Sequence, residues 1–421
     1  MHFDAAHMRS IVLIAVLGLL TAIDAIAIDM YLPAMPSIQL HFGTTAALVQ
    51  ASLTVFLIGL AIGQACVGPM ADRYGRRWPL MVGMALFVAG SLLILMAPVI
   101  EVLLLGRLLQ AFGAAAGLVV PRAIVADRYS SESAARTYTV LMQIMSVAPI
   151  CAPLAGSALL GVGDWRSVFL ALLGFGILCL ASVLFFVPET LAPERRSTDA
   201  LSKTVRDYWS LLRCPQYMSF TMASAFVTAG LFAYIGSAPF VFIESFQLSP
   251  SEFSWIFAFN GLGMLLTGMT NIFLLKRYHP FTVLRRALQV HFALTAILLS
   301  ICLISAKFVL IIVPLCGAIW CLGLVWGNVI ALAMKHGQGR HGAASALFGV
   351  LQYAVGGLAG VLLGLLSSHE PWTMAMFLVV CAAAACLSMQ AAHRMTQEQA
   401  DSALQLNQTR PLPRDALDVP H

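Results

Sequence analysis

The sequence carries very little charge for its length. Only 10% of its 421 residues are Asp, Glu, Lys or Arg, whereas 60% are apolar. Soluble domains have about 25% charged and 45–50% apolar residues, so this composition excludes an ordinary soluble protein. The apolar surplus lies in long blocks, as in membrane-spanning helices. We therefore predict an all-α polytopic membrane protein, with the lipid bilayer as its surroundings.

Motifs of several other protein classes are also missing. No basic run with interleaved aromatic residues accompanies the net charge of +5, so we expect no nucleic-acid partner. The nine cysteines show no C-x-x-C or metal-ligand spacing, so we expect no metal and no cofactor. H-E-x-x-H, G-x-S-x-G and the phosphate-binding G-x-x-x-x-G-K-[ST] are absent. These absences argue against a membrane enzyme or an ATP-driven pump.

Twelve apolar blocks are present, most of them near the ~20 residues that cross a bilayer core. They lie at about 10–33, 46–70, 78–97, 99–120, 137–160, 167–187, 217–242, 253–275, 283–305, 308–334, 343–367 and 372–393. A polar linker at 188–216 separates a first six-helix half, 1–187, from a second, 217–393. We expect 394–421 to be a disordered tail. Paired halves around a central cavity are typical of transporters.

Lys and Arg are distributed very unevenly among the connecting segments. If the N-terminus is cytoplasmic and the blocks alternate, all but three of the 24 Lys and Arg lie in or next to cytoplasmic segments. The exceptions are Arg166 and Lys307 outside and Arg107 within a block. The positive-inside rule therefore predicts that both termini are cytoplasmic.

Two acids interrupt the first block, in the stretch LGLLTAIDAIAIDMYLPAMP at 17–36. An ionised carboxylate at the bilayer centre costs at least about 2.5–3.5 kcal/mol, so we expect Asp29 to face the bundle interior or a water-filled cavity. Pro33 cannot donate to the Asp29 carbonyl, which should loosen the helix at the acid. Asp24 lies about 140° around the helix from Asp29. We predict that Asp29 is the main proton-exchanging group and Asp24 a secondary one, the alternative being that either acid merely pairs with a neighbour.

Arg107 is the one basic residue deep inside a predicted span. It lies about 12 Å below the outer start of its helix, and Asp29 about 10 Å below the outer end of its own. These matching depths predict an Asp29–Arg107 pair that couples transport to protons, formed directly or through water or Gln110. A small change in water access would change the protonation state of a carboxylate held between burial and a nearby cation. A static ion pair that fixes helix packing is the alternative.

Three motifs resemble those of a known family. GPMADRYGRRWPL, from Gly68, resembles the loop signature of the major facilitator superfamily, with Met70 in place of Leu. RLLQAFGAA, from Arg107, is similar to its fourth-span motif, and APICAPLAG, from Ala148, to its fifth-span antiporter motif. With AIDMYLPAMP, RAIVADRY, DWRSVF, VPET and ASALFGVLQ, the chain resembles the Bcr/CflA branch of multidrug efflux proteins over nearly its whole length.

The resemblance implies proton-driven export of small lipophilic drugs or antibiotics, of amphenicol or bicyclomycin type, from a bacterial cytoplasmic (inner) membrane. Asp29 and Arg107 match the family's membrane acid and fourth-span arginine. Asp72 matches a loop acid that caps a second-half helix, here one beginning at Ala343. Arg73 and Arg76 are expected to pair with Asp127. The proposed cytoplasmic latch comprises Gly68, Asp72, Arg73, Gly75, Arg76 and Asp127, and the antiporter motif comprises Pro149, Pro153 and Gly156. Charges that only enforce topology are the alternative for the latch.

Substrate contacts are expected from polar and aromatic side chains around the cavity. The candidates are Asp29, Tyr31, Tyr234, Asn328 and Gln352. Export of an endogenous metabolite, such as a purine nucleoside or sugar, is the alternative function, and a passive facilitator would not need Asp29. We expect the protein to act as a monomer.

Overall fold

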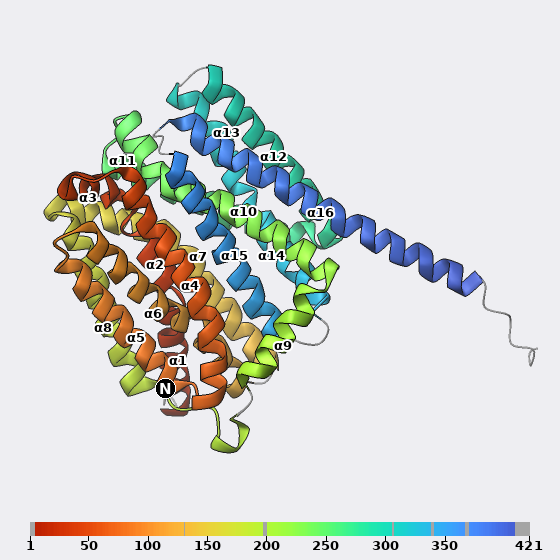
Figure 1. The fold of residues 1–421 in the computed structure, drawn as a ribbon. Coiled ribbons are helices and arrows are strands. Elements are labelled where there is room, and N and C mark those ends of the chain that lie inside the picture. The colour runs from red at the N-terminus through yellow and green to blue at the C-terminus, as the bar shows by residue number, and fades with distance from the viewer. Residues whose placement is uncertain are drawn as a thin grey trace, which may run out of the picture.

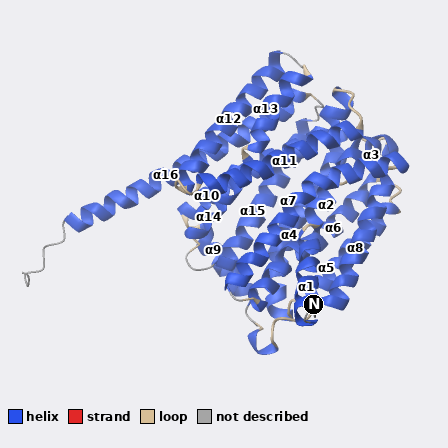
Figure 2. Cartoon of the chain, turned by 180° about the vertical axis from the view of Figure 1, so that it is seen from behind, coloured by secondary structure: helices blue, strands red, loops and turns tan. Residues whose placement is uncertain are grey.

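The structure, a computed structural model, describes residues 5–129, 131–196, 200–304, 307–337, 341–366 and 370–408. Within these ranges every element is helical, and twelve segments are long and apolar enough to cross a membrane (Figures 1 and 2). The predicted all-α fold with twelve spans is confirmed.

The helices fall into two sets on either side of the linker. In the first half they are α1 (Ala5–Thr21), α2 (Ile23–Asp29), η1 (Leu32–Ala34), α3 (Met35–Phe42), α4 (Ala46–Tyr74), α5 (Arg77–Leu95), α6 (Ile100–Arg128), α7 (Ser131–Val162) and α8 (Trp165–Phe186). The linker contains η2 (Pro193–Arg195) and α9 (Ala200–Leu212). In the second half they are α10 (Pro215–Pro239), the π-helical turn η3 (Phe240–Ser245), α11 (Pro250–Leu274), α12 (Pro280–Ile304), α13 (Phe308–Trp320), α14 (Leu322–Lys335), α15 (His341–Leu366) and α16 (Pro371–Gln408).

Local sequence signals account for several helix boundaries. Ser249 and Glu252 form a capping box at the start of α11, in which each side chain accepts a hydrogen bond from the other residue's backbone N–H. Asp164 caps α8 by accepting from the backbone N–H of Arg166 at 3.0 Å. Gly43 ends α3 in the left-handed conformation, with φ +58°.

The first span is interrupted near its middle. It runs as α1, α2, η1 and α3, and Pro33 lies within η1. Because Pro33 has no N–H, the carbonyl of Asp29 lacks its helical donor, and α2 ends at Asp29. The predicted loosening of the helix at this acid is confirmed.

The two halves pack against each other along two helix pairs, α4 with α15 and α7 with α11. Glycines allow the first of these pairs to approach closely, because a Cβ at Gly357 or Gly360 would meet Ile58 or Thr54 of α4. Figure 1 shows α9 and α3 at opposite ends of the bundle, which we call the linker end and the far end. At the far end the halves touch again, since α3 contacts η3 and η1 contacts α11.

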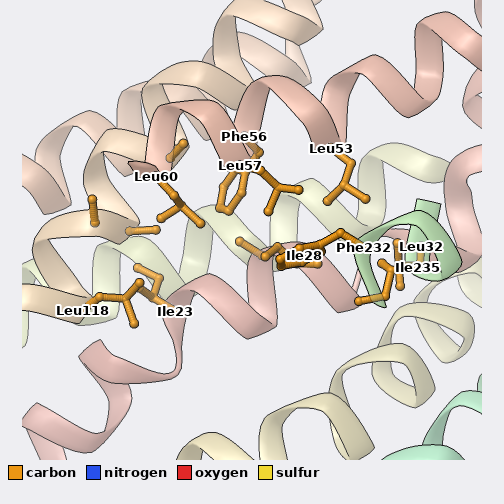
Figure 3. Packing of buried hydrophobic residues seen from close by; sticks show 14 of the residues in the cluster. Ile23, Ile28, Leu32, Leu53, Phe56, Leu57, Leu60, Leu118, Phe232 and Ile235 are labelled. Carbon is orange, nitrogen blue, oxygen red and sulfur yellow. The ribbon is translucent and has the colours of Figure 1, made fainter. Parts of the chain in front are cut away.

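The apolar core continues across the boundary between the halves. Figure 3 shows Ile28 and Leu32 of the first span beside Phe232 and Ile235 of α10, all in one buried cluster. α10 contacts η1 directly. The break in the first span therefore lies against the second half.

The expectation of a disordered tail is wrong for residues 394–408. α16 continues from its span to Gln408 and projects beyond the bundle (Figure 1). The sequence after Arg394 contains good helix formers and neither Gly nor Pro before Pro411, so nothing in it stops the helix. Residues 409–421 lie outside the described part of the chain.

Candidate functional site

Asp29 is the last residue of α2 and is 4% exposed. Among the residues that the structure describes, none donates a hydrogen bond to its carboxylate and none forms an ion pair with it. Asp24 lies close enough for the two carboxylate charges to repel each other. An ionised carboxylate without a partner is unfavourable in an apolar interior. Asp29 is thus placed where gain and loss of a proton change its interactions strongly.

Arg107, on α6, is fully buried beside the break in the first span. Its Nη1 donates to the Ala27 carbonyl at 3.0 Å and to Gln110 Oε1 at 2.9 Å. Gln110 in turn donates to Ser91 at 2.8 Å. The predicted direct pair with Asp29 is wrong for this conformation, because the guanidinium turns toward the backbone of α2 and its own helix. Arg107 lies at the level of Asp29, as expected, since it contacts Ala27 and Tyr31 on either side of that residue in the sequence. Its side chain, however, does not point at the Asp29 carboxylate.

Two aromatic rings enclose the Arg107 guanidinium. Its Cζ lies 4.5 Å from the ring centroid of Tyr31 and 4.2 Å from that of Phe56, which is cation–π geometry. The Tyr31 hydroxyl is 2.8 Å from the Ser52 hydroxyl, and Tyr31 has no exposed surface. Its role as a substrate contact stays a prediction and would require this packing to open.

Asp24 is bound from the other half of the molecule. The Tyr353 hydroxyl, on α15, donates to Asp24 Oδ2 at 2.9 Å, while Oδ1 is buried without a partner among the described residues. Arg122 is near enough to attract the carboxylate, and its Nε is also buried and unpartnered there. Arg122 lies within α6, six residues before its end at Arg128. The sequence signal for this position is a basic residue more than one helical turn before the end of its helix.

The second half brings one predicted substrate contact close to Asp29. Tyr234 interacts electrostatically with Asp29, accepts a hydrogen bond from Asn260 Nδ2 at 3.1 Å and stacks on Phe257 with ring centroids 5.9 Å apart. The Asn260 Oδ1 is buried without a partner in the described structure. Polar ends on an aromatic wall are what a site for small organic molecules needs.

The other two predicted contacts are held within the second half. Gln352 donates to Ser224 at 2.7 Å and to Thr228 at 3.2 Å. Asn328 donates to Asn271 Oδ1 at 2.8 Å. The structure does not bring them to Asp29 through any contact, and their binding roles stay predictions.

The loop between α4 and α5 forms a charged cluster at the linker end. Arg76 donates to Asp127 at 2.8 Å and also pairs with Asp72. The predicted Arg76–Asp127 pair is therefore present. Arg73 is exposed and lies over the Tyr74 ring instead, so its predicted pair with Asp127 is wrong here. The cap that Asp72 is expected to provide on a second-half helix stays a prediction.

Glu189, in the VPET segment, completes this cluster and was missed by the sequence reasoning. Its carboxylate accepts the backbone N–H of Arg76 at 2.9 Å and of Arg77 at 3.2 Å. Partial burial opposes ionisation of Glu189, but its backbone hydrogen bonds, including those from Thr190 and Leu191, outweigh burial and lower the pKa. The carboxylate joins the α4–α5 loop to the segment after α8.

The fifth-span motif packs against the break in the first span. Gly156 lies so close to the Met30 carbonyl and to Pro33 that a Cβ would collide with them. Pro149 and Pro153 lie within α7 itself. Gly68 of the loop motif, in contrast, has open space around the position of a Cβ.

The sequence profile described as Major Facilitator Superfamily matches residues 17–361. The chain belongs to this superfamily. A Bacillus subtilis relative named as an MFS-type transporter, YdgK, is 35% identical over 83% of this chain and 87% of its own length. The bicyclomycin resistance protein homolog of Haemophilus influenzae is 25% identical over 93% and 98%. The chloramphenicol resistance protein of Pseudomonas aeruginosa is 27% identical over 88% of each chain.

Solved structures of major facilitator transporters show the same fold. The xylose transporter XylE of E. coli, in a partially occluded inward-open conformation, aligns with a TM-score of 0.70 at 15% identity, over 90% of this chain and 97% of its own. The nucleoside transporter NupG aligns with a TM-score of 0.70 at 14% identity, over 92% and 99%. The predicted resemblance to the superfamily's drug-efflux transporters is confirmed by the named relatives. This protein is a multi-pass membrane transporter of small molecules.

Proposed function

We propose that this transporter exports small lipophilic drugs or antibiotics in exchange for protons. The observation that carries the proposal is Asp29, a buried carboxylate with no hydrogen-bond or ion-pair partner among the described residues, at the break of the first span. A buried acid without a partner is a poor structural element, because it stabilises no fold contact. It is a suitable proton carrier, because a proton or a ligand group relieves its desolvation.

Substrate and proton compete for Asp29 in this proposal. When the site faces the substrate side, a bound drug displaces the proton from Asp29. When the halves rock and the site faces the other side, protonation of Asp29 favours release of the drug. Tyr234, close to Asp29 and aromatic, contributes to the binding surface together with the predicted contacts Tyr31, Asn328 and Gln352.

The orientation of the transporter in the membrane follows from charge in the loops. We assign the linker end to the cytoplasm, because Lys and Arg are concentrated there, and the membrane to the bacterial inner membrane. Arg76, Asp72 and Asp127 then latch the cytoplasmic side, and protons enter from the far end. The protein works as a monomer in this scheme.

The names of the relatives favour drugs over metabolites as substrates. Relatives named for bicyclomycin and chloramphenicol resistance align over 88% or more of this chain. Similarity to sugar and nucleoside transporters is at 14–15% identity and concerns the fold alone.

Transport into proteoliposomes tests the substrate class. Labelled chloramphenicol, bicyclomycin, xylose and a purine nucleoside are each offered with and without an imposed pH gradient. We expect gradient-dependent accumulation of an antibiotic, lost in Asp29→Asn and kept in Asp164→Asn, an exposed helix-capping acid. Accumulation of the nucleoside or sugar alone would overturn the drug assignment, and transport without gradient dependence would overturn antiport.

A further inference from the structure

Asp24 has a hydrogen-bond partner in the second half of the transporter and a nearby cation, Arg122, in its own half. In this conformation Tyr353 of α15 donates to its Oδ2 at 2.9 Å. The position of the tyrosine is fixed in part by Phe232, whose ring centroid lies 6.0 Å away. This hydrogen bond joins the first span to the second half at a buried depth, since Asp24 is only 4% exposed.

One acceptor and one donor of this cluster are unsatisfied. Asp24 Oδ1 and Arg122 Nε are both buried without partners among the described residues. The two residues attract each other but lie beyond ion-pair distance. Arg122 belongs to α6, in the same half as Asp24. A buried acceptor and a buried donor that both lack a partner, on residues that attract each other, suit a contact that forms in another conformation.

We propose that Asp24 is a charge-dependent tether, bound by Tyr353 across the halves in this conformation and by Arg122 within the first half when the halves separate. An ionised Asp24 is bound more strongly by the Arg122 cation than by the neutral Tyr353 hydroxyl, so a proton on Asp24 weakens the Arg122 contact more and favours the conformation bound to Tyr353. Asp29, on the same helix and repelling Asp24, adds its own charge to this balance. Tyr353 and Arg122 are positioning residues, because they act on transport through Asp24.

This inference rests on the proposed proton coupling but is tested without transport. Spin labels at Leu40→Cys, on α3, and Ser251→Cys, on α11, replace two exposed residues at the far end, in a chain whose nine native cysteines are substituted. Pulsed electron–electron distance measurements in nanodiscs then give the populations with the far end closed, as here, and open.

The two partners of Asp24 should shift this population in opposite directions. Tyr353→Phe removes the inter-half bond and should lower the ratio of closed to open molecules by about tenfold. Arg122→Gln removes the alternative partner and should raise that ratio. Tyr217→Phe, which deletes a buried hydroxyl bonded to Ala344 within the second half, is the matched control and should leave the ratio unchanged.

The pH dependence separates a tether from a mere packing contact. In an Asp29→Asn background, lowering the pH should close the far end, and Asp24→Asn or Arg122→Gln should abolish that closure. An unchanged ratio in Tyr353→Phe, or shifts of the same sign in Tyr353→Phe and Arg122→Gln, would overturn the tether. Drug-evoked proton release by the same samples is measured separately, so loss of the proposed function is distinguished from loss of the tether.

Discussion

Single residues determine the geometry of the charged cluster at the linker end. Gly75 has φ +93° and ψ 170°, a region that essentially only glycine occupies. Its missing side chain also leaves room for the carboxylate of Glu189, which a Cβ would meet. The turn can therefore present the backbone N–H groups of Arg76 and Arg77 to that carboxylate.

Gly75→Ala should destabilise the transporter by about 1–3 kcal/mol, because an L side chain is strained at this φ and displaces Glu189. Gly68→Ala is the control in the same motif, where a Cβ has open space. Melting in detergent, followed by size-exclusion chromatography, measures both. Equal melting temperatures for the two variants would refute the role given to Gly75.

Glu189 makes the stability of this cluster depend on pH. Its pKa is lowered in the folded protein, so its contribution is fully present above the ordinary value of 4.5 and disappears as the pH falls through the lowered pKa. Glu189→Gln should lower the melting temperature by about 1–3 °C at neutral pH, and the difference should vanish in acid. Glu194→Gln, an exposed neighbour, should show neither effect. A difference that persists unchanged at pH 3 would contradict the account.

Residue-level prediction succeeded for depth and failed for direction. The sequence placed Asp29 in a loosened helix and Arg107 at the same depth, but rotation about each helix axis is set by packing. Arg107 therefore faces Ala27, Tyr31 and Phe56 rather than Asp29. The Asp24–Tyr353 bond joins residues 329 positions apart, a pairing that no local pattern encodes.

At the scale of elements, the transporter depends on how α7 packs against the break in the first span. Gly156 of α7 lies against the Met30 carbonyl of the first span. On the second half, Gly261 of α11 packs against Ile150 of α7. α7 thus lies between the broken span and the second half, a position from which its movement reaches Asp29.

Gly156→Ala should push α7 away from the first span, because the added Cβ meets backbone atoms that cannot rotate aside. We expect this overpacking to lower the free energy of unfolding by about 1–3 kcal/mol. Antibiotic transport should fall at least tenfold. Gly161→Ala, in the same helix with open space around the Cβ position, should transport normally. Normal transport by both variants would show that this contact has no functional weight.

At the scale of the whole molecule, the fold was predictable and the contacts between its halves were not. Twelve apolar blocks and the motifs near Gly68 and Ala148 carry the fold, because span length and turn chemistry are local. The helical course of residues 394–408 was missed because a terminal segment was expected to be disordered, although helix propensity is high there. α3 and η3 contact each other across the two halves in this conformation, and no sequence pattern predicts that contact.

Proton release from the purified transporter tests the central claim most directly. Amphenicols, bicyclomycin, lipophilic cations and purine nucleosides are titrated into weakly buffered detergent solution, with Asp29→Asn in parallel. The account predicts proton release on addition of an antibiotic, absent in Asp29→Asn while the variant stays folded. Release that survives the substitution, or binding of a transported compound without any release, would contradict the assignment of Asp29 as the exchanging group.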